Sequence, residues 1–217
     1  MTDTTSVPVT ENGGGFAGTI QYWLALIFIV GWTGVIGGGL AFQFLAWEYP
    51  CPLCMLQRMF MTLAALGGVY IVRKGMDGVI EARDYMVGWG MAIVASICGG
   101  FAAWRQTMLH ILPGDPGYAG AFLGMHLYVW SWVLFTASVA VIGIVFTFSH
   151  STAATAIPES YRTVGKLAIW LCGAVIVINL VAVFLLEGFH WKLPDDPACY
   201  QIFHDLGILE GGCELPG

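Results

Sequence analysis

Two cysteines three residues apart, Cys51 and Cys54, stand between two long apolar runs of the chain. A Cys-x-x-Cys pair can serve as a redox dithiol or as half of a zinc site. A helix that begins near Cys51 places Cys54 in its first turn, where unpaired backbone N–H groups and the positive end of the helix dipole favour a thiolate. The pair therefore has the setting of a redox dithiol at the surface of a membrane.

Arg58 follows Cys54 by four residues, which places it on the same face of a helix. Its guanidinium cannot lose its charge, and a permanent cation just inside a membrane is costly, so it indicates a functional site. A thiolate beside a fixed cation at this depth suits reaction with a lipid-soluble electron acceptor, for which a quinone is the obvious candidate. The alternative is that Arg58 only extends its charged end to the lipid headgroups.

The elements that position these residues are membrane-spanning helices. Of the 217 residues 58% are hydrophobic and 10% are charged, whereas a soluble domain averages about 25% charged residues. Five apolar stretches each reach the roughly 20 residues that a span requires: residues 23–47, 53–72, 85–104, 122–148 and 167–186. We therefore predict an all-α membrane protein with five transmembrane helices.

Four glycines lower the hydrophobicity of the third apolar stretch, which contains no charged residue. They are Gly88, Gly90, Gly99 and Gly100, and we expect them to permit close helix packing.

The balance of 14 acidic against 8 basic residues excludes nucleic acid as a plausible partner.

Lysine and arginine gather in the loops after the second and fourth spans, which predicts that these loops are cytoplasmic. The residues are Arg73, Lys74, Arg83, Arg162 and Lys166. Five spans then place the N-terminus in the cytoplasm and the C-terminus on the outer side. The expected division is a disordered cytoplasmic tail (1–21), a four-helix bundle (22–148), a cytoplasmic loop (149–165), a fifth transmembrane helix (166–187) and an outer tail (188–217).

This topology places a second cysteine pair, Cys199 and Cys213, on the same outer side as Cys51 and Cys54, in an oxidising compartment where disulfides persist. A Cys199–Cys213 bridge would close a loop of about 15 residues and contribute around 3 kcal/mol in the chain-entropy model. It is either a structural staple on an amphipathic tail or a second redox pair that exchanges with Cys51–Cys54. The mid-span Cys98 and Cys172 are expected to be small packing residues.

Two further groups of side chains carry weaker alternatives. His190, Cys199, His204 and Cys213 could be drawn as a zinc site, but their spacing fits no compact pattern and an oxidising compartment favours the disulfide, so we expect no metal. His126, near the start of the fourth span, either donates a hydrogen bond to a quinone oxygen or anchors the helix at the membrane interface.

Two segments resemble the DsbB family of disulfide bond formation proteins, and the resemblance extends over residues 22–148. Residues 51–58 read CPLCMLQR at a helix start, and residues 104–113 read WRQTMLHILP after the third span. The resemblance implies a quinone-linked thiol oxidase of the bacterial inner membrane. Such a protein reoxidises a periplasmic thioredoxin-fold dithiol oxidase (DsbA-like) and passes two electrons to ubiquinone or menaquinone.

The resemblance also implies a role for each matching residue. Cys54 is the sulfur next to the quinone, and Cys51 is its disulfide partner and the link to a second cysteine pair. Arg58 is the arginine of the quinone site, and Gln106 is a polar residue near the quinone.

The chain departs from the family pattern in two ways. Family members carry the second cysteine pair between the third and fourth spans, but residues 112–120 contain no cysteine here. A fifth span is added, and Cys199 and Cys213 follow it. We expect this span to deliver the second pair, so that electrons enter at Cys199–Cys213, pass to Cys51–Cys54 and leave from Cys54 to the quinone. Alternatively, the shuttle has been lost and the tail is only structural.

Two other functions fit the same residues. One is a non-catalytic accessory subunit of a larger membrane complex, which would keep the disulfides for stability. The other is the same electron path in reverse, reducing disulfides on the outer face.

Overall fold

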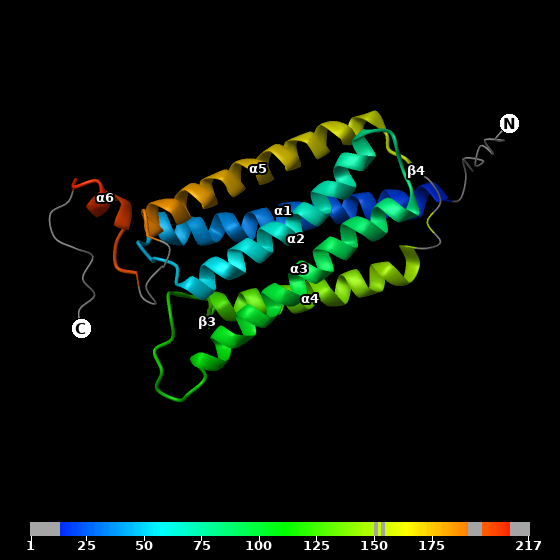
Figure 1. The fold of residues 1–217 in the computed structure, drawn as a ribbon. Helices are drawn as coiled ribbons and strands as arrows, with labels where there is room; N and C mark the ends of the chain where they lie inside the picture. Colours follow the sequence, from blue (N-terminus) through cyan, green and yellow to red (C-terminus); the bar gives the residue numbers. More distant parts are fainter. Residues whose placement is uncertain (1–13, 150–151, 153–154, 191–196, 209–217) are drawn as a thin grey trace.

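The computed structural model describes residues 14–149, 152, 155–190 and 197–208 (Figure 1). Within this part of the chain, five helices are long and apolar enough to cross a membrane. They are α1 (Gly14–Leu45), α2 (Pro52–Met76), α3 (Ala82–Leu109), α4 (Leu127–Ser149) and α5 (Glu159–Glu187), with a short α6 (Gln201–Asp205) after them. The prediction of an all-α membrane protein with five transmembrane helices is confirmed.

Three helix starts differ by more than three residues from those predicted. Helix α5 begins at Glu159, so residues 159–165, which we expected in the cytoplasmic loop, are helical. Helix α1 begins at Gly14, so residues 14–21, which we expected in the disordered tail, are helical. They are held by long-range contacts: the Tyr85 hydroxyl donates to the Gly18 carbonyl (2.8 Å), and the Gln21 amide donates to Thr152 Oγ1 (2.6 Å). The polar, glycine-rich composition of this segment did not reveal those contacts.

Helix α4 begins at Leu127 and not at residue 122, because a hairpin precedes it. Strands β2 (Ala121–Phe122) and β3 (Met125–His126) pair antiparallel. The turn between them has positive φ at Leu123 (51°) and Gly124 (80°). An apolar run of four or five residues does not distinguish a strand from a helix end, which is why the hairpin was missed.

The two ends of the helix bundle carry different features (Figure 1). At one end, β1 (Val79–Ile80) pairs antiparallel with β4 (Thr155–Ala156) and joins the α2–α3 and α4–α5 loops. The basic residues of those loops lie at this end. The start of α2, the β2–β3 hairpin and α6 lie at the opposite end (Figure 1). Cys51, Cys54 and Cys199 therefore lie at the same end of the helix bundle.

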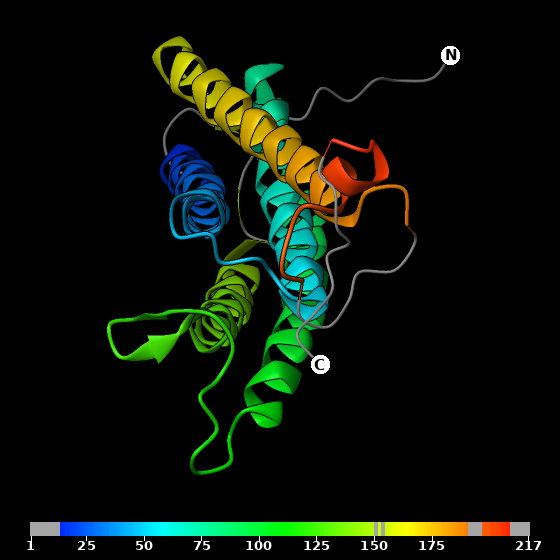
Figure 2. The same cartoon turned by 90° about the vertical axis from the view of Figure 1, so that its left-hand side faces the viewer.

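Small residues allow the helices to pack closely. The prediction is confirmed for Gly88 and Gly99 of the third span, whereas nothing lies within 4 Å of a side chain at Gly90. A side chain at Gly67 of α2 would meet the Gly88 carbonyl of α3, and one at Gly99 of α3 would overlap the Phe135 ring of α4. Helix α5 lies across α1 and α2 (Figure 2), and a side chain at its Gly165 would meet the Tyr22 hydroxyl. The fifth helix is therefore packed on the bundle.

Replacing Gly67 with alanine should destabilise the protein by about 1–3 kcal/mol, the usual range for overpacking. The added Cβ would lie 2.5 Å from the Gly88 carbonyl oxygen and 2.9 Å from the Ala92 Cβ, and backbone cannot move aside cheaply. Thermal unfolding in detergent measures the change. Gly90→Ala in α3 is the control, because nothing lies within 4 Å of that Cβ. Equal stability of the two variants would contradict the close α2–α3 contact.

Candidate functional site

The start of helix α2 is organised around Cys51. Cys51 is the N-cap residue, and its Sγ accepts the backbone N–H of Cys54 at 3.2 Å. Pro52 occupies the first helical position, where its missing N–H costs nothing and its fixed φ suits the helix. An N-cap usually accepts this hydrogen bond through a side-chain oxygen, and here a sulfur accepts it. Cys54 consequently lies in the first turn, where free N–H groups favour a thiolate.

Cys51 and Cys54 are not bonded to each other in this structure. Cys51 is buried, with 7% of its surface exposed. A hydrogen bond to the Cys54 side chain and burial raise the pKa of the Cys51 thiol above its usual range. Of the two sulfurs, Cys51 is buried and Cys54 is the more accessible. A Cys51–Cys54 disulfide stays a prediction for the oxidised state.

Two glutamines from neighbouring helices surround the sulfurs. Gln106 of α3 donates through Nε2 to Cys51 Sγ (3.2 Å) and to Cys54 Sγ (3.3 Å). Its Oε1 accepts from Gln57 Nε2 of α2 at 2.6 Å and, over a longer distance of 3.8 Å, from the Cys54 thiol. Gln106 and Gln57 are 1% and 3% exposed, so protein groups and not bulk water supply their partners.

Arg58 turns toward helix α1 and ties the two helices together. Its Nη1 donates to Gln43 Oε1 at 2.7 Å, and its Nη2 donates to the Gly39 carbonyl at 2.9 Å. A side chain at Gly39 would approach Nη2 to 3.2 Å, so the glycine leaves room for the guanidinium. Arg58 is 8% exposed. This geometry contradicts the alternative that Arg58 only extends to the headgroups.

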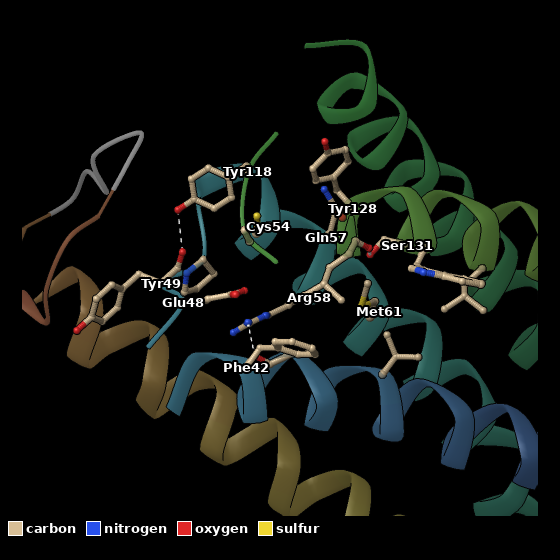
Figure 3. A pocket seen from close by; sticks show the side chains of 17 residues that line it. Phe42, Glu48, Tyr49, Cys54, Gln57, Arg58, Met61, Tyr118, Tyr128 and Ser131 are labelled. Carbon is tan, nitrogen blue, oxygen red and sulfur yellow. Dashed lines mark hydrogen bonds between the residues drawn. The ribbon is translucent and has the colours of Figure 1, made fainter. Parts of the chain in front are cut away.

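Cys54 and Arg58 both line one cavity among α1, α2, α4 and the loops that cover them (Figure 3). The cavity has a volume of about 120 Å³ and opens into a wider space. Its walls combine apolar side chains such as Met61 with the polar groups of Gln57 and Ser131. Gln106 and Cys51 are not among the lining residues, so Gln106 contacts the sulfurs without bordering the cavity. This combination of apolar walls and a few convergent polar groups is typical of a small-molecule site.

The loop between α3 and α4, which lacks cysteines, forms part of the wall of this cavity. The Tyr118 hydroxyl donates to the Tyr49 carbonyl at 2.7 Å (Figure 3), and the Gly120 N–H donates to Glu48 Oε2 at 2.8 Å. His126 stacks on Tyr128 with ring centres 5.3 Å apart, and its Nδ1 lies 3.0 Å from the Ala119 carbonyl oxygen. His126 is not among the residues that line the cavity, whereas Tyr128 is.

The C-terminal tail contacts the site through Tyr200. Its ring packs edge-on to Tyr49 (5.2 Å between centres) and stacks on Phe44 (6.4 Å). Its hydroxyl accepts from Gln43 Nε2 at 3.5 Å. Gln43 also accepts the hydrogen bond from Arg58, so a chain of side chains connects the tail to the cavity.

Cys199 precedes Tyr200 and is disulfide-bonded. Its predicted partner, Cys213, lies outside the described residues. Cys172 is buried within the bundle, as expected of a packing residue, whereas Cys98 is exposed on the outside of α3.

Asp205 braces the tail against the end of α5. Its carboxylate accepts from the Phe189 N–H (2.8 Å) and from Gln201 Nε2 (3.2 Å), and lies 3.0 Å from His190 Nε2. The Phe189 N–H is the main reason that the pKa of Asp205 lies below its usual value. Gly188 turns the chain here with φ of 66°. His190, one of the residues in the alternative zinc set, therefore pairs with a carboxylate.

Sequence reasoning did not identify Gln43, Gln57 and Tyr200 as parts of this site. A signal existed for the two glutamines, because an uncharged polar side chain inside a span seeks a partner within the bundle. No local pattern pointed to Tyr200, which meets Gln43 across 157 residues of sequence.

Comparisons with known proteins match the first half of the chain. The family model for disulfide bond formation protein DsbB matches residues 21–120. Disulfide bond formation protein B of Polaromonas sp. (strain JS666 / ATCC BAA-500) is 30% identical over 95 residues, which is 43% of this chain and 53% of that protein. The chain thus matches about half the length of this curated relative. No solved structure matches.

The matched region contains Cys51, Cys54, Arg58 and Gln106. It ends before α4, so the last two spanning helices and the tail lie outside it. The predicted resemblance is confirmed for residues 21–120.

Proposed function

Because residues 21–120 are DsbB-like, we propose that this protein is a membrane thiol:quinone oxidoreductase that supports disulfide bond formation. It reoxidises a periplasmic thioredoxin-fold dithiol oxidase and passes the electrons to ubiquinone or menaquinone. The observation that carries the proposal is that Cys54 and Arg58 line the same cavity. The net reaction converts a partner dithiol and a quinone into a partner disulfide and a quinol, with two electrons and two protons transferred.

The residues of the cavity fit a quinone head group. A bound quinone supplies a two-electron acceptor beside the dithiol. Arg58 uses two of its five N–H donors on Gln43 and Gly39, so donors remain for a quinone oxygen, and Met61 and Leu134 offer apolar contact for the ring. Cys54 is the sulfur that borders this space, while Cys51 is not among the lining residues.

We assign the entry of electrons to Cys199–Cys213, which exchanges with Cys51–Cys54. The support is the position of Tyr200: it packs on Tyr49, two residues before Cys51, and follows Cys199 directly. Disulfide exchange moves a pair of electrons from one sulfur pair to the other through a mixed disulfide. A sulfur pair at the end of the fifth helix can thus replace the pair that the loop between α3 and α4 lacks.

We place the protein in the bacterial inner membrane with the N-terminus cytoplasmic and the C-terminus periplasmic. The basic residues of the α2–α3 loop and of the start of α5 lie at the bundle end opposite Cys51. Lysine and arginine mark cytoplasmic loops, which puts both cysteine pairs in the oxidising compartment.

The purified protein in detergent should reduce ubiquinone when it is given a reduced thioredoxin-fold dithiol oxidase, with quinol formation followed by absorbance. Replacing Cys199 and Cys213 together with serine should lower this turnover at least about 100-fold, because the shuttle step is removed. Quinone reduction driven by dithiothreitol should persist in the same variant, since a small dithiol reaches Cys51–Cys54 directly.

The two activities separate the parts of the proposal. Partner-driven turnover that survives the double substitution would refute the tail shuttle alone. Absence of turnover with every cysteine intact, with both the partner and dithiothreitol, would refute the oxidoreductase and favour a non-catalytic subunit of a membrane complex. Tyr200→Ala tests the docking contact: it should slow the partner-driven reaction only.

A further inference from the structure

The side-chain amide of Gln106 can be oriented in two ways. The orientation decides whether its NH₂ group or its carbonyl oxygen faces the sulfurs of Cys51 and Cys54. With Nε2 toward the cysteines, Gln106 donates N–H groups to both sulfurs; with Oε1 toward them, it presents a partial negative charge. Oxygen and nitrogen of an amide are told apart by the hydrogen-bond network around them. Gln106 is 1% exposed, so that network consists of protein groups.

We propose that Gln57 is a positioning residue that fixes this direction, so that Gln106 donates to Cys51 and Cys54 and not to another group. Gln57 Nε2 donates to Gln106 Oε1 at 2.6 Å. That hydrogen bond directs Oε1 toward Gln57, so that the NH₂ group makes the shorter contacts with the sulfurs, at 3.2 Å and 3.3 Å, while the Cys54 thiol lies 3.8 Å from Oε1. The relevance of Gln57 to disulfide formation rests on the proposed function, whereas its effect on the reactivity of Cys54 does not.

The reaction needs a hydrogen-bond donor at this place. When an incoming thiolate attacks Cys51 in the oxidised pair, a new S–S bond forms, the Cys51–Cys54 bond breaks, and the electron pair leaves on Cys54 Sγ. A donor that is already aimed at Cys54 stabilises this thiolate without reorganisation. Because Gln106 Nε2 lies within hydrogen-bond distance of both sulfurs, it can also donate to a thiolate at Cys51.

The position of Gln57 suits a role that acts through Gln106. Gln57 lies three residues after Cys54 on α2, and its side chain crosses to α3, where Gln106 lies. It lines the cavity as well, so its amide lies between the space for the acceptor and the group that holds the sulfurs. Gln57 makes no hydrogen bond to either sulfur among those found for the described residues, so any effect on Cys54 chemistry passes through Gln106.

A double-mutant cycle tests the proposal. The variants are Gln57→Met, Gln106→Met and the two together, since methionine has a similar length and no donor. The readout is the alkylation rate of Cys54 by iodoacetamide at pH 7 in reduced, quinone-free protein, quantified on the Cys54 peptide by mass spectrometry. Gln57→Met should slow this rate about 5- to 10-fold, the effect of one hydrogen bond to a charged group. In the Gln106→Met background the same change should have no effect.

Two results would overturn the proposal. One is an unchanged rate in Gln57→Met. The other is an equal slowing by Gln57→Met with and without Gln106, which would mean that Gln57 acts by packing. Gln21→Met is the matched control, because Gln21 is a buried, hydrogen-bonded glutamine whose partner, Thr152, lies at the far end of the bundle; it should leave the rate unchanged.

The assay contains no quinone and no protein partner, so its result is independent of the proposed function. Normal coupling in the cycle with no quinone turnover would refute the oxidoreductase and leave the role of Gln57 standing. If Gln57→Met does not fold, Gln57→Asn replaces it: asparagine keeps the amide but withdraws the donor from Gln106, and the same slowing is expected.

Discussion

Replacing Cys54 with serine should abolish quinone reduction, with a fall of at least about 1,000-fold whether the electrons come from a protein dithiol or from dithiothreitol. Cys54 is the cysteine that lines the cavity beside Arg58, so its sulfur is the group that meets the acceptor. A hydroxyl at this position is not ionised at neutral pH and forms no disulfide. Absorbance of the quinone measures the loss directly.

The two cysteines of the pair should differ in their access to the cavity. In Cys51→Ser, a thiol-reactive benzoquinone should modify Cys54. In Cys54→Ser, the remaining Cys51 is 7% exposed and bonded to Gln106, so it should react much more slowly. Cys98→Ser is the control, because Cys98 lies exposed on α3 away from the site and its loss should leave turnover unchanged. Equal labelling of the two variants would contradict the assignment of Cys54 as the acceptor-facing sulfur.

Replacing Arg58 with alanine should raise the apparent KM for quinone about 10-fold or more, because a charged donor is removed from the cavity wall. The same change leaves Gln43 Oε1 and the Gly39 carbonyl without the donor they have now. Unfolding free energy should therefore fall by about 1.5–3 kcal/mol. Quinone titrations of steady-state turnover measure the first effect, and thermal unfolding measures the second.

Arg58→Lys separates charge from geometry. Lysine keeps the positive charge but lacks the planar fork that reaches Gln43 and Gly39 together, so we expect an intermediate KM. Arg105→Ala is the control, because Arg105 is exposed near the C-terminal end of α3. This variant should leave the KM for quinone unchanged. An Arg58→Ala protein with unchanged KM and lower stability would show that Arg58 only joins α1 to α2.

The relation between the site and the tail explains how a second cysteine pair can work from an unusual place. The loop between α3 and α4 is held at the cavity by hydrogen bonds of Tyr118 and Gly120 and contains no cysteine. The tail lies at the same end of the bundle. Its Asp205 accepts a hydrogen bond from Phe189, just after α5, and its Tyr200 accepts one from Gln43 near the end of α1. The added helix α5 thus returns the chain to the end where the dithiol lies.

The sequence alone determined the five spans, the position of Cys51 and Cys54 at a helix start, and the placement of Arg58 in the next turn. These features depend on local patterns: an apolar run must satisfy its own backbone as a helix in lipid, and spacing along one helix fixes which side chains share a face. The same reasoning failed at residues 14–21 and 121–126, where contacts with distant segments or a short hairpin decided the conformation.

The tertiary structure decided which side chains meet. Gln57 and Gln106 are 49 residues apart, Arg58 and Gln43 are 15 apart, and Gln43 and Tyr200 are 157 apart. Each pairing depends on how far one helix is rotated and shifted against its neighbour, and close contacts such as that of Gly67 with Gly88 set this register. Hydropathy carries no information on rotation or register between helices, so a sequence can reveal a dithiol beside a cation but not the amides that hold both in place.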